Sequence, residues 1–359
     1  MFLGMVPHSK PNHMLKSNQK VAVYMEGHVN SDYGKMGIGV VRYLKNPIIG
    51  VIDSKLGGKK MSDFMNTSKD VPILQTLDEA ILRGAEVLVL GIAPSGGKIP
   101  ESWKPTIETA LKSGLSIVNG LHDLLNPHWK SKIKDPNKQW IWDVRIPPFT
   151  PTIATAQAAK LKNKRVLFIG TDMAVGKMTA GLELYAYFQE KRANVGFIAT
   201  GQIGITITGK GIPLDAYIVD HACGAVEQIV MEEADKKILI IEGQGSLLHP
   251  GSTATLPLMR GSCPTHLVLC HRADKKTLRS PSNIRIPDLK EFIALNESLA
   301  TVLGTFPKAK VIGVAVNTSK LSNKEAKEYV SQLSEELGLP VTDPVRYDMQ
   351  IIGDYILKN

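Results

Sequence analysis

Apolar positions follow two alternating patterns along the chain. Short runs rich in Val, Ile and Leu predict buried strands, whereas longer segments with apolar residues every three or four positions predict amphipathic helices. In the first half the predicted strands are Val21–Tyr24, Ile48–Ile52, Val87–Leu90 and Leu115–Val118, and the predicted helices are Met36–Leu44, Leu77–Arg83 and Ile107–Lys112. Strands that alternate with helices are typical of an α/β protein with mostly parallel sheets.

The alternation stops after residue 125 and starts again in the second half. Residues 126–153 contain five prolines and show no clear period, which predicts a linker or an irregular interdomain strip. Beyond it the predicted strands are Arg165–Ile169, Val195–Ala199, Ile238–Ile241, His266–Leu269 and Val311–Val316, and the predicted helices are Lys177–Gln189, Ala225–Glu233, Pro287–Val302 and Lys324–Leu337. We therefore expect two domains that meet near residue 150.

The composition is that of an ordinary globular protein, with 43% hydrophobic and 21% charged residues. The three cysteines Cys223, Cys263 and Cys270 have no metal-ligand spacing, and their odd number argues against a disulfide framework. A reducing, cytoplasmic setting fits this pattern best. Because no apolar run has signal-peptide or membrane-spanning length, we expect a soluble protein with no membrane partner.

The net charge of +9 favours anionic ligands but not nucleic acid. The Lys and Arg residues are scattered and form no basic block with interleaved aromatic residues. We expect a small-molecule amino-acid substrate, no nucleic acid, and assembly into a homo-oligomer.

The segment FIGTDMAVGKMTAG, residues 168–181, lies between a predicted strand and a predicted helix. Glycines and a lysine at such a turn supply free N–H groups, a helix dipole and an ammonium group, all of which attract phosphate. Five residues separate Gly170 from Gly176 where the usual phosphate-binding loop has four, and Met178 replaces the hydroxyl residue after the lysine. In the usual loop the hydroxyl directly after the lysine ligates Mg²⁺, and Thr179 lies one residue later, rotated about 100° further around the helix. We therefore expect this loop to bind phosphate without a Mg²⁺ ligand at that position.

Three motifs in the second half resemble known families. GTDMAVGK resembles the GTD-x-x-VGK loop of dethiobiotin synthetase, although that family has Thr directly after the lysine. ILIIEGQGSLLHPG is similar to the strand-ending E-G-x-G of the same superfamily, which implies a metal-holding or water-holding role for Glu242. GVAVNT places Asn317 where such enzymes approach the nucleotide base.

The whole chain resembles more closely a two-domain family long described as a domain of unknown function. The signature GTD-x-A-VGK-M-T, the ATGQIGI loop, the Asp220-His221 pair and EGQGSLLHPG carry this resemblance. It implies an α/β fold with a Rossmann-like N-terminal parallel-sheet domain over residues 1–150 and a P-loop NTPase-like, dethiobiotin synthetase-like parallel-sheet domain over residues 151–359. Members include D-glutamate N-acetyltransferases that use acetyl-CoA.

That activity suits a phosphate-binding loop without a metal-ligating hydroxyl, because coenzyme A brings phosphates but transfers none. We expect the cofactor to contact Gly170, Thr171, Asp172, Val175, Gly176, Lys177, Met178, Thr179 and Asn317. Two alternatives stay open. One is an ATP-dependent ligase or carboxylase of the dethiobiotin synthetase type, with Mg²⁺ on Asp172 and Glu242. The other is a nucleotide-sensing module without turnover.

Polar residues after the strand Val195–Ala199 are candidates for catalysis. His221, oriented by the carboxylate of Asp220, is a candidate base that takes the proton of the attacking amine. The alternative is that Asp220 caps the following helix and His221 is merely exposed. Gln202 is a candidate donor to a developing oxyanion, and His249 is the rival base. Cys223 is expected to be a small buried residue and not a nucleophile.

The first domain offers two weaker motifs. Gly34, Lys35, Gly37 and Gly39 at a strand-to-helix turn, with Asp53 after the next strand, mimic a dinucleotide fingerprint, but their order is G-x-x-G-x-G and not G-x-G-x-x-G. The SGGK segment at 95–98 is a second anion cradle, followed along the chain by Asn119, His122 and Asp123 at the next strand end. For the carboxylates of glutamate we propose the three residues Ser95, Lys98 and Arg145.

Overall fold

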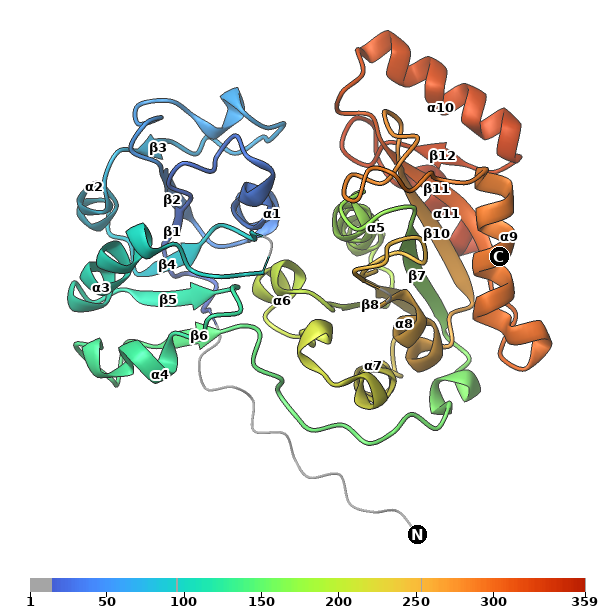
Figure 1. The fold of residues 1–359 in the computed structure, drawn as a ribbon, viewed down its shortest axis with the longest axis horizontal. Helices are drawn as coiled ribbons and strands as arrows, with labels where there is room; N and C mark the ends of the chain where they lie inside the picture. Colours follow the sequence, from blue (N-terminus) through green and yellow to red (C-terminus); the bar gives the residue numbers. More distant parts are fainter. Residues whose placement is uncertain (1–14, 95, 253, 359) are drawn as a thin grey trace. The chain divides into compact units, whose positions relative to one another are not determined.

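The computed structural model describes residues 15–94, 96–252 and 254–358, which form two compact units (Figure 1). The first unit comprises the chain up to Phe149 together with Gln202–Pro213, and the second comprises Thr150–Gly201 and the chain from Leu214 onward. Both units are parallel six-stranded sheets with helices on their faces, which confirms the predicted α/β class.

The first sheet has the strand order β3-β2-β1-β4-β5-β6, which is the order of Rossmann folds. Its strands are β1 (Val21–Tyr24), β2 (Ile48–Ile52), β3 (Ile73–Leu74), β4 (Val87–Leu90), β5 (Ser116–Asn119) and β6 (Ile141–Asp143). Its helices are α1 (Lys35–Tyr43), α2 (Leu77–Leu82), α3 (Lys104–Lys112), α4 (Asn126–Trp129) and α6 (Gln202–Thr208). β1 and β4 are buried at every position, because helices cover both faces of the sheet.

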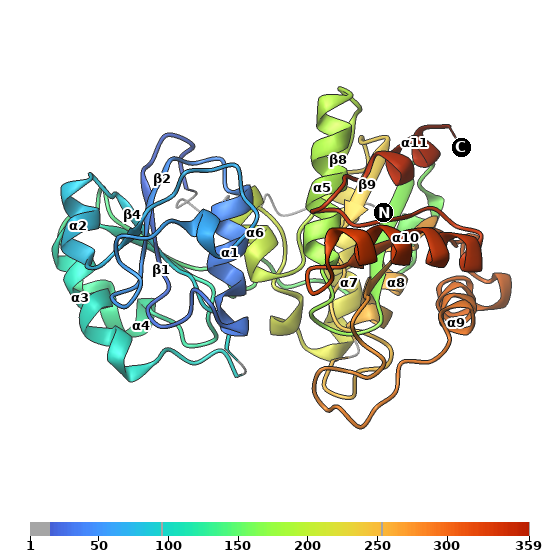
Figure 2. The ribbon, with the colours of Figure 1, turned by 90° about the horizontal axis from the view of Figure 1, so that it is seen from above.

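Helix α6 reaches the first unit from the second half of the sequence. It packs against α1, and the two helices lie on one face of the sheet while α2 and α3 lie on the other (Figure 2). Gly120 permits this packing, because a Cβ there would lie 3.2 Å from Gln202 Cγ and 3.3 Å from Met36 Cε. The chain returns to the second unit at Leu214, whose N–H donates to Thr200 O at 3.1 Å.

The prediction of a linker or irregular strip over residues 126–153 is wrong for residues 126–143, whereas residues 144–153 have no helix or strand and contain the boundary between the two units. Residues 126–143 contain α4 and the edge strand β6, which pairs in parallel with β5. Its prolines misled the prediction, because one of them lies in the first turn of α4, where a missing N–H costs nothing. A strand of three residues is also too short to show a period of its own.

The second sheet has the strand order β12-β11-β10-β7-β9-β8. Its strands are β7 (Lys164–Gly170), β8 (Val195–Ile198), β9 (Ile238–Ile241), β10 (His266–Arg272), β11 (Lys310–Asn317) and β12 (Val341–Thr342). Its helices are α5 (Lys177–Glu190), α7 (Val219–Glu232), α8 (Thr255–Ser262), α9 (Leu289–Thr301), α10 (Asn323–Leu337) and α11 (Gln350–Lys358). The strand order reverses direction at β7 and β10, and the carboxyl ends of strands at such a point bind ligands in open α/β sheets.

No helix in the described ranges has the length and apolar character needed to cross a membrane.

The buried carboxylate of Asp143 offers a test of how β6 is held. It accepts hydrogen bonds of 2.8–3.0 Å from Asn119 Nδ2, from the N–H groups of Leu125 and Asn126, and from Asn126 Nδ2. Asp143→Ala leaves these donors without their acceptor, so we expect a loss of about 2–4 kcal/mol in the free energy of unfolding, measured by urea denaturation. Asp70→Ala removes an exposed ion pair and should cost less than about 1 kcal/mol. Equal losses in the two variants would contradict this interpretation.

Candidate phosphate-binding site

The phosphate loop, residues 170–179, lies between β7 and α5. β7 ends at Gly170 and α5 begins at Lys177, so the loop lies at the N-terminal end of the helix, where free N–H groups collect. Gly176 has φ +106°, a left-handed conformation that favours glycine. At Gly170 a Cβ would lie 2.8 Å from Val175 Cγ2 and 3.0 Å from Lys177 Nζ. Geometry therefore requires both glycines of the signature.

The ammonium group of Lys177 is buried inside this loop. The residue is 4% exposed, and its Nζ donates to the carbonyl oxygens of Asp172 at 2.7 Å and Met173 at 2.9 Å. Gly243, directly after Glu242, makes room for the side chain, since a Cβ there would lie 2.8 Å from Lys177 Cδ and 1.7 Å from Phe168 O. The loop thus combines a fixed cation with a helix N-terminus, which is the equipment that a phosphate group requires.

Thr171 and Asp172 hold the loop in shape. Thr171 is fully buried, and its Oγ1 lies 3.0 Å from Nδ1 of His271 on the neighbouring strand β10. Burial lowers the pKa of His271 to about 4, so its imidazole is neutral at physiological pH. The Asp172 carboxylate accepts the N–H of Met173 at 2.6 Å and the N–H of Arg279 at 2.8 Å. Both carboxylate oxygens are therefore engaged by the backbone.

Glu242 joins the loop that follows β9 to the loop that follows β8. It is 2% exposed, and its Oε2 accepts the N–H groups of Thr200 at 2.9 Å and Gly201 at 3.2 Å. Burial raises the pKa of Glu242 to about 7, and this effect outweighs the lowering by the two N–H donors and by the nearby Lys177 charge. The carboxyl group consequently titrates near neutrality.

The two residues after the lysine lie in the first turn of α5 and are half-buried. Met178 has no oxygen to offer a metal, and Thr179 is displaced around the helix by one position. The described residues contain no group of three or more His, Cys, Asp or Glu side chains that could hold a metal ion. The residues present fit a phosphate group better than a metal-bound triphosphate.

The two candidate bases have different surroundings. Nδ1 of His249 accepts the N–H of Gly251 at 3.0 Å, so Nε2 carries the proton and donates to Ser280 O at 2.6 Å. This buried ring is held between two loops and has no lone pair left for an amine. Asp220 and His221 lie next to each other in the first turn of α7, and consecutive helix residues do not face each other. The helix geometry therefore gives no support to an Asp–His pair.

His221 nevertheless keeps a half-buried imidazole at the start of α7, and within the described ranges no hydrogen bond engages its ring. Burial raises the pKa of the nearby Cys223 thiol, which disfavours the thiolate needed for nucleophilic attack.

Other predicted site residues lie in the first unit. Gln202 begins α6 beside Gly120, and Nε of Arg145 donates to Gly120 O at 2.8 Å. Two of the predicted polar residues therefore meet the same glycine. Lys98 is exposed, and Ser95 lies outside the described residues.

The dinucleotide-like glycines of the first unit are explained by packing. A Cβ at Gly34 would lie 2.3 Å from His28 O, and one at Gly37 would lie 2.2 Å from the sulfur of Met25. The buried Asp53 carboxylate accepts the N–H groups of Gly27 and Lys55, both at 3.1 Å. Since its oxygens close loops of the protein itself, the geometry does not favour a ribose-binding role.

The last of the predicted cofactor contacts, Asn317, ends β11. Its Oδ1 accepts the N–H of Ser319 at 3.0 Å, so the side chain shapes the turn that follows the strand. Contact between Asn317 and a nucleotide base stays a prediction.

Several partners of Glu242 and of the phosphate loop could not be predicted from the sequence. They are the N–H groups of Thr200 and Gly201 for Glu242, and the N–H of Arg279 and the imidazole of His271 for the loop. Backbone donors leave no mark in a sequence, and only the pairing of β10 with β7 brings His271 next to Thr171. The sequence did show Gly243, as part of the E-G-x-G motif. Its close approach to the carbonyl oxygen of Phe168 in β7 explains why a glycine follows Glu242.

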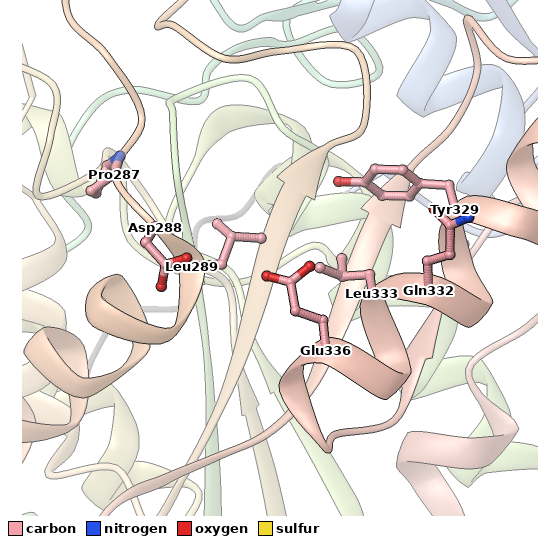
Figure 3. A pocket seen from close by; sticks show the side chains of 7 residues that line it. All are labelled: Pro287, Asp288, Leu289, Tyr329, Gln332, Leu333 and Glu336. Atoms are coloured by element: carbon pink, nitrogen blue, oxygen red, sulfur yellow. The ribbon is translucent and has the colours of Figure 1, made fainter.

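A separate cavity of about 270 Å³ lies between α9 and α10. Figure 3 shows the Tyr329 hydroxyl and the Glu336 carboxylate directed into it, and Asp288 lies at its edge. Burial and the Glu336 charge raise the pKa of Tyr329 to about 12. Two carboxylates at this cavity would repel phosphates and the carboxylates of glutamate, so we do not assign it to either.

The raised pKa of Glu242 predicts a pH-dependent stability. Because this pKa is raised above its unfolded value of 4.5, the contribution to stability is complete below pH 4.5 and is lost as the pH rises through 7. The melting temperature of the protein should therefore fall relative to that of Glu242→Gln between about pH 4.5 and pH 7.5, by the equivalent of about 2–4 kcal/mol. If the difference in melting temperature between the protein and Glu242→Gln does not change with pH, the raised pKa of Glu242 is contradicted.

Comparisons with known proteins identify a P-loop domain and a Rossmann-like domain, in agreement with the phosphate loop and the strand order described above. Residues 152–352 match the family described as "Domain of unknown function (DUF1611_C) P-loop domain", and residues 54–147 match "Domain of unknown function (DUF1611_N) Rossmann-like domain". The crystal structure of a DUF1611 family protein from Anabaena variabilis is 43% identical, with a TM-score of 0.91, and the match covers 95% of this chain and 100% of that chain.

Two relatives carry a functional name. A D-glutamate N-acetyltransferase from a Pseudoalteromonas species is 38% identical over 270 residues, which are 75% of this chain and 80% of the relative. One from Tritonibacter scottomollicae is 37% identical over 274 residues, which are 76% of this chain and 81% of the relative. With both domains matched and relatives aligned over most of its length, the chain belongs to the DUF1611 family.

Proposed function

We propose that this protein transfers the acetyl group of acetyl-CoA to the amino group of D-glutamate, with the phosphate loop holding the CoA phosphates. The observation that carries the proposal is Met178, in a loop that otherwise has every part needed to bind phosphate. An acyl transfer leaves the phosphates of CoA intact and needs no metal ligand after the lysine. The names of the two relatives support the acceptor.

The reaction requires a neutral amine, because an ammonium group has no lone pair with which to attack the thioester carbonyl. We propose that His221 removes this proton, since His249 is engaged through both ring nitrogens whereas no hydrogen bond in the described ranges engages the His221 ring. The attack gives a tetrahedral oxyanion, for which Gln202 is the proposed donor. Collapse of this intermediate breaks the C–S bond and releases the CoA thiolate, which takes up a proton.

For the substrate carboxylates we keep Arg145 and Lys98 as proposed partners. Arg145 is the stronger of the two, because its bond to Gly120 O fixes one edge of the guanidinium group. A fixed planar guanidinium suits a carboxylate better than the point charge of an exposed lysine does.

Free thiol release tests the proposal. The protein, mixed with acetyl-CoA and D-glutamate, should release one thiol for each N-acetylglutamate formed. Lys177→Met should raise the KM for acetyl-CoA roughly tenfold to a hundredfold, because it removes a charged partner of the phosphates. Lys191→Met, which removes an exposed lysine from the other end of the same helix, should leave it unchanged.

Two results would contradict the proposal. ADP release from ATP and Mg²⁺, without thiol release from acetyl-CoA, would favour the ligase or carboxylase. Tight nucleotide binding without any product would favour a sensing module.

A further inference from the structure

The loop between β10 and α9 folds into a short hairpin. Thr277 and Arg285 form an antiparallel bridge. On either side of the bridge the Leu278 N–H donates to Ile284 O and the Ile286 N–H donates to Lys276 O, both at 2.9 Å. The pairing is therefore defined next to the bridge, and it fixes the faces of the side chains of residues 276–278 and 284–286.

The hairpin is fastened to the phosphate loop. The N–H of Arg279 donates to Asp172 Oδ2 at 2.8 Å, and the carbonyl of the next residue, Ser280, accepts from Nε2 of His249 at 2.6 Å. Because the backbone of Arg279 contacts Asp172 of the phosphate loop, its side chain starts next to that loop.

The hairpin carries two arginines, Arg279 and Arg285. Directly paired residues lie on the same face of a two-stranded ribbon, and so do residues two apart along a strand. Arg285 is paired with Thr277 and shares its face, whereas Arg279 lies two residues beyond Thr277, in the bend where the hairpin turns back. Leu278, which is 1% exposed, lies on the opposite face with Lys276. Both arginines are exposed.

Coenzyme A carries two separate phosphate groups, a pyrophosphate and a phosphomonoester on the ribose. The phosphate loop has one lysine and one helix N-terminus, which suit the pyrophosphate. Arginine binds phosphomonoesters in a bidentate manner. We propose that Arg279, assisted by Arg285, binds the ribose phosphate of CoA and makes the protein prefer CoA over its dephosphorylated form. This inference rests on the proposed function and adds a determinant of cofactor specificity.

Calorimetric titration with CoA and with 3′-dephospho-CoA tests the subsite, because both ligands contain the pyrophosphate. The protein should bind CoA about tenfold more tightly than dephospho-CoA. In Arg279→Gln/Arg285→Gln the two affinities should become equal, with the affinity for dephospho-CoA unchanged, which also shows that the phosphate loop is intact. Lys276→Gln removes one charge from the opposite face of the same hairpin and should keep the tenfold preference.

The subsite alone would be overturned if the unaltered protein bound CoA and dephospho-CoA equally, or if the preference for CoA survived in the double variant. It would also be overturned if the double variant lost affinity for both ligands equally, or if Lys276→Gln lost the preference to a comparable degree. Failure of the unaltered protein to bind either ligand would instead refute the proposed function, and the subsite with it.

Discussion

The phosphate-binding site is organised around one buried cation, the ammonium group of Lys177. A buried cation is costly unless it has partners, and here the carbonyls of Asp172 and Met173 supply them. This arrangement fixes the loop in a curve around the lysine. A Cβ at Gly170 would crowd Val175 and Lys177, and one at Gly243 would meet the Phe168 carbonyl first and then Lys177. The cation is thereby held in place for an anion before any ligand arrives.

The acids and histidines around this lysine mostly hold backbone in position. Asp172 fastens the β10–α9 hairpin, Glu242 holds the loop after β8, and His249 joins two loops through both ring nitrogens. These side chains resemble metal ligands or bases in the sequence, yet their hydrogen-bonding capacity is largely used. The site is consequently poor in unengaged carboxylates, and its positive groups are Lys177 and the N-terminus of α5, a balance that suits binding of an anionic cofactor more than metal-assisted phosphoryl transfer.

Sequence patterns predicted the α/β class, every long strand and the phosphate loop, because buried parallel strands read as continuous apolar runs. They did not predict β3, β6 or β12, whose two or three residues are too short for a periodic signal. They also missed the helices α4, α6, α8 and α11, and the α6 sequence QIGITIT contains no charged residue to mark a solvent face. Side-chain roles were harder to predict. Whether His249 is a base or a link between loops depends on Gly251 and Ser280, and the second of these contacts spans 31 positions of the chain.

On this account the phosphate loop binds acetyl-CoA through Lys177 without a divalent metal. The most direct test is calorimetric titration of acetyl-CoA into the protein in the presence of EDTA, repeated with excess Mg²⁺. We expect the same affinity in both conditions and a marked loss in Lys177→Met. Binding that appears only with Mg²⁺, or that persists undiminished in Lys177→Met, would contradict the account.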